Sequence, residues 1–193
     1  RYESLCEGLL SFSSALSGFP LLAQRRNIGY NRGLFFSKNG FFSHLNLSKG
    51  EAKLFVDEAS NSRNTAVCLS SKAMTLSNKQ KSYFEWFYHK RSYFNLAKRL
   101  RFSSLLILGM NFFSQFSFWL LIPVLFFYQI NTQLVILAFS LRFCMQYIVY
   151  WKMCKFTNEY SLLWFLPLYE ISLMLIYFML SLSTFIKKVH DWD

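Results

Sequence analysis

The fold is decided by residues 76–102, LSNKQKSYFEWFYHKRSYFNLAKRLRF, in which lysine and arginine alternate with tyrosine, phenylalanine and tryptophan. Directly after this stretch, residues 103–128 carry no charged side chain. Tryptophan and tyrosine favour the headgroup level of a bilayer, and lysine and arginine favour its cytoplasmic side. We therefore predict a basic interface helix within about residues 77–102, which lies at the membrane surface over 86–102 and leads the chain into the bilayer.

The distribution of charge supports the same division. Residues 1–101 hold 16 lysines and arginines against 6 acidic residues, whereas residues 102–193 hold 5 against 4. A basic half followed by an apolar half is typical of a membrane protein with a cytoplasmic face. Nucleic-acid binding, the usual alternative for a net charge of +11, is disfavoured because the cations crowd against the start of the apolar half.

The apolar half contains two or three hydrophobic helices, at about residues 103–128, 134–150 and 161–186. The first and last are long enough to cross a hydrocarbon core of about 30 Å. The middle segment carries Arg142 and Gln146, so it either crosses or lies in the interface. Glu170 in the last segment should face protein or lie near the interface. Charge leaves two and three crossings open, because each arrangement puts one lysine pair, 152 and 155 or 187 and 188, opposite the polar half.

The polar half has a mixed pattern. Apolar residues at helical spacing predict a helix over about residues 2–16, and residues 21–30 are strand-like. Ser48 and Glu51 have the spacing of a capping box for a helix that begins near Lys49. Residues 65–69, TAVCL, predict a strand, and residues 73–76 a second extended piece. The predicted fold class is therefore α/β, followed by α-helical transmembrane segments.

The order of short motifs in this half resembles the second half of the catalytic domain of membrane-anchored bacterial family 2 glycosyltransferases. The motifs are NIGY at 27–30, LF at 34–35, NGF at 39–41, His44, GEAKLF at 50–55, NTAV at 64–67, TLS at 75–77 and WFYHKRSY at 86–93. The resemblance implies that residues 1–101 are the C-terminal part of a GT-A-type nucleotide-sugar domain and residues 102–193 its membrane anchor. It also implies that the donor-binding half, with the site for a divalent metal (Mg or Mn), lies upstream of Arg1. The D-W-D at 191–193 follows the last apolar segment and is no nucleotide site.

In such a protein, a sugar passes from a nucleotide-sugar donor to a glycan or a lipid-linked acceptor, at the cytoplasmic face of the bacterial inner membrane. The resemblance makes Glu51 the candidate catalytic base, although the same residue could serve only as a helix cap. Lys90 and Arg91 would contact the donor diphosphate or, alternatively, anionic lipid headgroups. By itself this fragment, without the donor half, should not turn over.

Three further residues have two interpretations each. His89 could hydrogen-bond substrate or lie among the interfacial cations, and Trp86 could form an acceptor-site wall or a membrane anchor. His44 could line the acceptor pocket or be an ordinary polar residue. The sequence departs from the family at residues 51–53, EAK in place of an acidic run, and at 89–93, where HKRSY replaces the usual glutamine–arginine pattern. These departures favour the alternative, a non-catalytic membrane protein whose basic aromatic junction binds anionic lipid or a partner protein.

Overall fold

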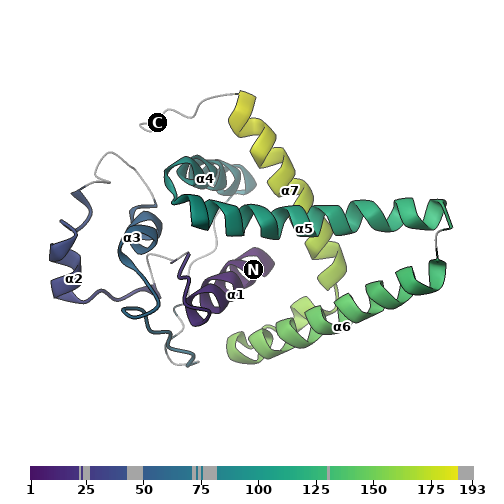
Figure 1. Ribbon diagram of the computed structural model, residues 1–193, viewed down its shortest axis with the longest axis horizontal. Coiled ribbons are helices and arrows are strands. Elements are labelled where there is room, and N and C mark those ends of the chain that lie inside the picture. Colours follow the sequence, from purple (N-terminus) through teal and green to yellow (C-terminus); the bar gives the residue numbers. More distant parts are fainter. Residues whose placement is uncertain are drawn as a thin grey trace.

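The computed structural model describes residues 1–21, 23, 27–42, 50–70, 73, 75, 82–129 and 131–186. Within these residues all regular structure is helical (Figure 1). The elements are α1 (Tyr2–Leu16), α2 (Arg32–Ser37), α3 (Glu51–Ala59), α4 (Tyr83–Leu96), η4 (Ala97–Arg99), α5 (Phe102–Phe127), α6 (Thr132–Thr157), η5 (Tyr160–Leu163) and α7 (Leu166–Ile186).

The predicted α/β fold class, the C-terminal half of a GT-A-type domain, is therefore wrong. Residues 65–69, predicted as a strand, have no regular structure, and the described parts of 21–30 contain no strand. A β-strand is stable only when a neighbouring strand satisfies its backbone donors and acceptors. No other segment among the described residues is a strand, so within them residues 65–69 have no partner to pair with. Of the extended piece predicted at 73–76, residues 74 and 76 lie outside the described residues.

The helices predicted for the polar half agree with the structure better than the strands do. The helix at 2–16 is confirmed as α1, and the helix expected near Lys49 is α3. Its N-cap is Gly50, whose φ of +93° favours glycine, and a Cβ added there would lie 2.0 Å from the Leu96 side chain. The predicted cap Ser48 lies outside the described residues. The interface helix is shorter than predicted, since α4 ends at Leu96 and α5 begins after an extended residue, Leu100.

Three helices among the described residues are long and apolar enough to cross a membrane: Phe102–Phe127, Thr132–Thr157 and Leu166–Thr184. Their length and composition are those of membrane-spanning helices. The middle segment, predicted at 134–150, is longer than expected because α6 continues through Lys152 and Lys155 to Thr157. The domain boundary predicted at residue 101 stays a prediction.

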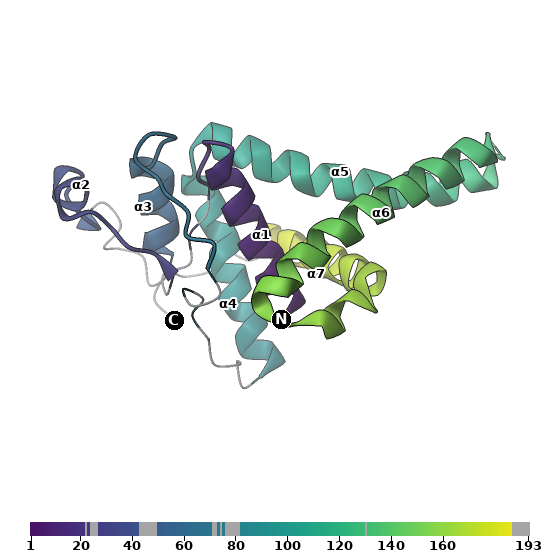
Figure 2. The ribbon, with the colours of Figure 1, turned by 90° about the horizontal axis from the view of Figure 1, so that it is seen from below.

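The α5–α6 hairpin projects beyond the rest of the molecule (Figures 1 and 2). Figure 2 shows α4 and α1 running across the direction of α5. Between α1 and the C-terminal end of α6 lies a small apolar core, made of Tyr2, Leu5, Cys154, Leu162, Leu163 and Leu166. The first helix of the polar half is thus packed directly on the membrane helices.

Candidate functional site

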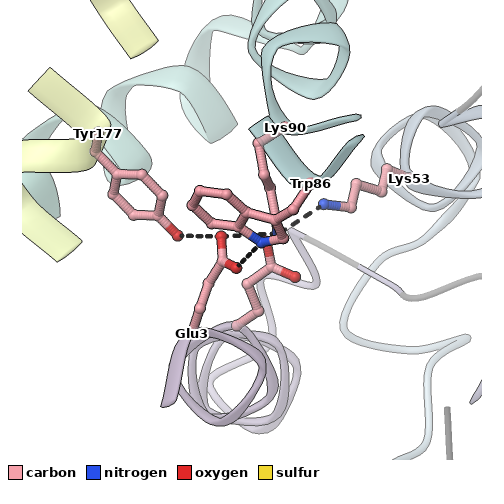
Figure 3. Close-up of polar contacts among 6 residues, drawn as sticks. Glu3, Lys53, Trp86, Lys90 and Tyr177 are labelled. Atoms are coloured by element: carbon pink, nitrogen blue, oxygen red, sulfur yellow. Dashed lines mark hydrogen bonds and ion pairs between the residues drawn. The ribbon is translucent and has the colours of Figure 1, made fainter. Parts of the chain in front are cut away.

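The side chains of Trp86 and Lys90 lie one helical turn apart on α4 and point to α1 (Figure 3). The indole Nε1 of Trp86 donates to Glu3 Oε2 at 2.9 Å. The Lys90 ammonium lies 2.9 Å from Glu3 Oε1 and 2.8 Å from Glu7 Oε1. Glu3 and Glu7 are themselves one turn apart on α1, so two matching helix faces meet.

Two more helices contribute to the same place. Lys53 of α3 lies 3.9 Å from Glu7 Oε1 and 4.3 Å above the ring of Tyr93. The hydroxyl of Tyr177, on α7, donates to Glu3 Oε1 at 3.3 Å. We call Glu3, Glu7, Lys53, Lys90, Trp86 and Tyr177 the ion-pair cluster. It joins α1, α3, α4 and α7 by charge-assisted contacts.

The electrostatics of the ion-pair cluster are those of a closed network. The four charged side chains are only 12% to 23% exposed, and two carboxylates balance two ammonium groups. Burial opposes the charge of Lys90, but Glu7 and Glu3 outweigh that effect, and the Lys90 pKa is raised. Burial lowers the pKa of Lys53, and the nearby Lys90 adds to this against the attraction of Glu7. The Lys90 ammonium group is therefore charged and paired with the two carboxylates of α1.

The other predicted site residues point elsewhere. Arg91 donates from Nη2 to the backbone oxygen of Ser183 on α7 at 2.9 Å. The imidazole of His89 lies 5.0 Å from the ring of Tyr93. Glu51 occupies the first turn of α3, where a carboxylate is favoured by the helix dipole. Trp86 and Lys90 thus lie together against α1, whereas Arg91 donates a hydrogen bond to α7. His44 lies outside the described residues.

The acidic partners of the cluster were not predicted from the sequence. Glu3 and Glu7 are the two charged residues of α1, and their i, i+4 spacing places both carboxylates on one face of the helix, where they could have indicated a cationic partner. Tyr177 had no such signal, because a tyrosine within a long apolar run is ordinary.

A second polar arrangement holds the start of α5. Asp57 of α3 is buried and accepts from the backbone N–H of Arg101 at 2.7 Å and from the hydroxyl of Ser104. It acts as an N-cap supplied from another helix. A cavity of about 290 Å³ adjoins it, lined in part by Asn61, Arg101 and Ser103. The cap fixes the position at which the chain leaves the polar half.

A third polar contact lies among the apolar helices. Arg142 of α6 is 2.6 Å from Glu170 of α7, and its guanidinium lies 3.6 Å above the Phe118 ring. Glu170 is 4% exposed. It therefore faces protein, one of the two places expected for it, and it neutralises the arginine that made the middle segment doubtful.

Within the part of the chain that the structure describes, no three His, Cys, Asp or Glu side chains gather as metal ligands. Comparisons with protein-family models, with curated proteins and with solved structures found no match. The site must therefore be interpreted from its own geometry.

Proposed function

We propose that this chain is a multi-pass membrane protein whose polar half rests on the cytoplasmic leaflet and binds anionic lipid without catalysing a reaction. The observation that carries the proposal is the asymmetry of the α5–α6 hairpin. Exposed cations lie at both of its polar ends, namely Arg99 and Arg101 before α5 and Lys152 and Lys155 in α6. The connection at residues 128–131, YQIN, has no charge. This asymmetry follows the positive-inside rule.

Aromatic side chains accompany these cations. Phe102 at the start of α5 is 78% exposed, and Trp164 after α6 is 86% exposed, with Trp151 and Tyr160 also exposed. Amphipathic rings beside lysine and arginine form the belt expected at the headgroup level. Phosphatidylglycerol or another anionic lipid is the partner that fits such a belt.

The ion-pair cluster supports the non-catalytic interpretation. Trp86 and Lys90, which the resemblance assigned to substrate, make their contacts with Glu3 and Glu7 instead. A cation that neutralises two buried carboxylates already has its counter-charge, so it is poorly placed to hold a diphosphate.

The test is the thermal midpoint of the full chain in lipid nanodiscs, with and without phosphatidylglycerol. Each cation near an anionic surface contributes about 1 kcal/mol to binding. The double variant Arg99→Gln/Lys155→Gln removes two of these four cations and should therefore lose about 2 kcal/mol, about half of the stabilisation that the four provide through the anionic lipid. The control Lys38→Gln changes an exposed cation at the end of α2, away from the hairpin (Figure 1), and should keep it. Equal stabilisation of all three proteins would refute the proposal.

A second candidate, a glycosyltransferase, is favoured by one observation. The two segments that carry the GEAKLF and WFYHKRSY motifs, α3 and α4, lie against each other: Lys53 lies over the Tyr93 ring, and Leu96 lies against Gly50. An acceptor site of the intact enzyme would need these segments side by side. The sugar would come from a nucleotide-sugar donor, with a divalent metal, and go to a glycan or lipid-linked acceptor.

The two candidates are separated by a transfer assay on the full-length, membrane-embedded protein with a panel of nucleotide sugars and Mg²⁺ or Mn²⁺. Turnover of any donor that is lost in Glu51→Gln, with folding intact, would support the enzyme and assign Glu51 as its base. Absence of turnover in a folded protein supplied with a lipid acceptor would leave lipid binding as the function.

A further inference from the structure

The helix α7 contacts the polar half along most of its length. Near its start, the Tyr169 ring stacks on Tyr2 with centroids 5.4 Å apart. At its middle, Tyr177 donates to Glu3, and near its end Ser183 accepts from Arg91. From residue 169 to 183, 14 residues, or about 21 Å of helix at 1.5 Å per residue, separate the outer two contacts. A helix that crossed a bilayer away from the polar half would contact it at one end only.

The helices α5 and α6 behave differently. Figure 1 shows α7 passing across α5, and beyond that point α5 and α6 continue without another element beside them. The crossing is marked by Phe178, which stacks on Phe116 with centroids 6.0 Å apart. From Phe116 to Phe127, 11 residues, or about 16 Å, of α5 remain. That length is about one leaflet, half of a hydrocarbon core of about 30 Å.

The outer face of α7 is apolar and exposed. Leu168, Leu175, Met179 and Leu182 are between 47% and 63% exposed. Their spacing of seven, four and three residues places them on one stripe of the helix. Glu170 and Leu180, on the other side, are buried against the protein. Acyl chains of the leaflet beside the polar half would cover this stripe, since the opposite face of α7 is already packed.

The distribution of lysine and arginine agrees with the placement of α7 in the leaflet beside the polar half. It also resolves the number of crossings, which the sequence left open. If α5 and α6 alone cross, Arg99, Arg101, Lys152 and Lys155 lie on one side. The lysines at 187 and 188 lie outside the described residues, but they follow α7 in the sequence and join the same side. Both lysine pairs then lie on the side of the polar half, as the positive-inside rule expects. If α7 spans the membrane, one of the two pairs lies on the opposite side, whether the chain crosses two or three times.

We infer that α7 does not cross the membrane: it is confined to the leaflet next to the polar half, with its Leu168–Leu182 stripe against lipid acyl chains. The chain then crosses twice, through α5 and α6, and its two ends lie on the same side. This inference rests on the proposed membrane placement of the hairpin. Length and hydropathy alone would allow α7 to span, so the contacts with α1 and α4 decide the matter.

The first test is a pair of fusions at the C-terminus of the full chain in a bacterial cell. Green fluorescent protein is fluorescent only in the cytoplasm, and alkaline phosphatase is active only outside it. The same reporters at the N-terminus fix the side of the polar half. We expect both ends to report one side, and alkaline phosphatase inserted after Gln129 to report the other. Opposite reports from the two ends would overturn the inference.

A second test measures depth directly. Spin labels are attached to Leu168→Cys and Leu182→Cys in a background without the exposed Cys68 and Cys144. A helix confined to one leaflet places both labels in that leaflet, whereas a spanning helix separates them across the midplane. Carbonate extraction distinguishes the two proposals: a chain that leaves the membrane refutes the proposed function, and an inserted chain with labels in opposite leaflets refutes only this inference.

Discussion

Replacing Lys90 by methionine removes a cation that contacts both carboxylates of α1. The side chains of Lys90, Glu3 and Glu7 are 15%, 12% and 23% exposed. Removing one partner of a buried ion pair costs about 3–5 kcal/mol, because the remaining charge stays buried without compensation. Partial exposure of Glu7 and the neighbouring Lys53 place the expected loss near the lower limit, about 3 kcal/mol. For a chain of this size that lowers the midpoint by about 6–12 °C.

The assay is thermal unfolding of the full chain in detergent, followed by tryptophan fluorescence. Lys38→Met is the matched control, because Lys38 is exposed and its replacement should leave the midpoint within about 2 °C. The quadruple variant Glu3→Gln/Glu7→Gln/Lys53→Met/Lys90→Met removes all four charges of the cluster and should recover most of the loss. If Lys90→Met unfolds at the midpoint of Lys38→Met, the ion-pair cluster does not stabilise the fold.

The contribution of Lys90 to the stability of the fold should decrease at high pH. The pKa of Lys90 is raised, so the folded protein holds its proton more tightly than the unfolded chain does. The stabilisation is therefore fully present below the ordinary pKa of 10.5 and is lost as pH rises above that value. Lys53 acts in the opposite sense, since its lowered pKa is a penalty that deprotonation relieves. A midpoint difference between the native chain and Lys90→Met that grew with pH above 10.5 would contradict this account.

Three further predictions concern single contacts. Asp57→Ala should lower stability by about 1–2 kcal/mol, because α5 loses its N-cap, and an unchanged midpoint would rule the cap out. Arg142→Met should reduce the yield of monodisperse protein by leaving Glu170 unpaired, and adding Glu170→Leu should restore it; a poorer double variant would contradict the pairing. Burial raises the pKa of Cys6 from 9.0 to about 11, which lowers its thiolate fraction near pH 8 about 100-fold, so maleimide should label the exposed Cys68 well before it.

The sequence predicted the elements whose signal is local. The apolar spacing of α1, the Ser48–Glu51 capping-box spacing before α3 and the long uncharged run of α5 are each local signals, and all three helices are close to their expected positions. The strand predicted at 65–69 is absent, because a β-strand needs a neighbouring strand and residue propensity carries no information about that partner. The same limit applies to the site: Trp86 and Lys90 stood out as residues, but their partners Glu3 and Glu7 lie more than 80 positions away.

The position of α1 has a consequence for the order of folding. Glu7 is 83 residues from Lys90, Tyr2 is 148 residues from Tyr150, and Glu3 is 174 residues from Tyr177. Because α1 precedes these partners in the chain, its contacts with α6 and α7 form only after nearly all of the described residues have been synthesised. Its carboxylates can meet Lys53 and Lys90 earlier, but until α6 and α7 exist its apolar face has only water or a chaperone beside it. Folding of the polar half thus completes after membrane insertion rather than before it, and a truncated product ending before α5 would be held unfinished and exposed to proteolysis.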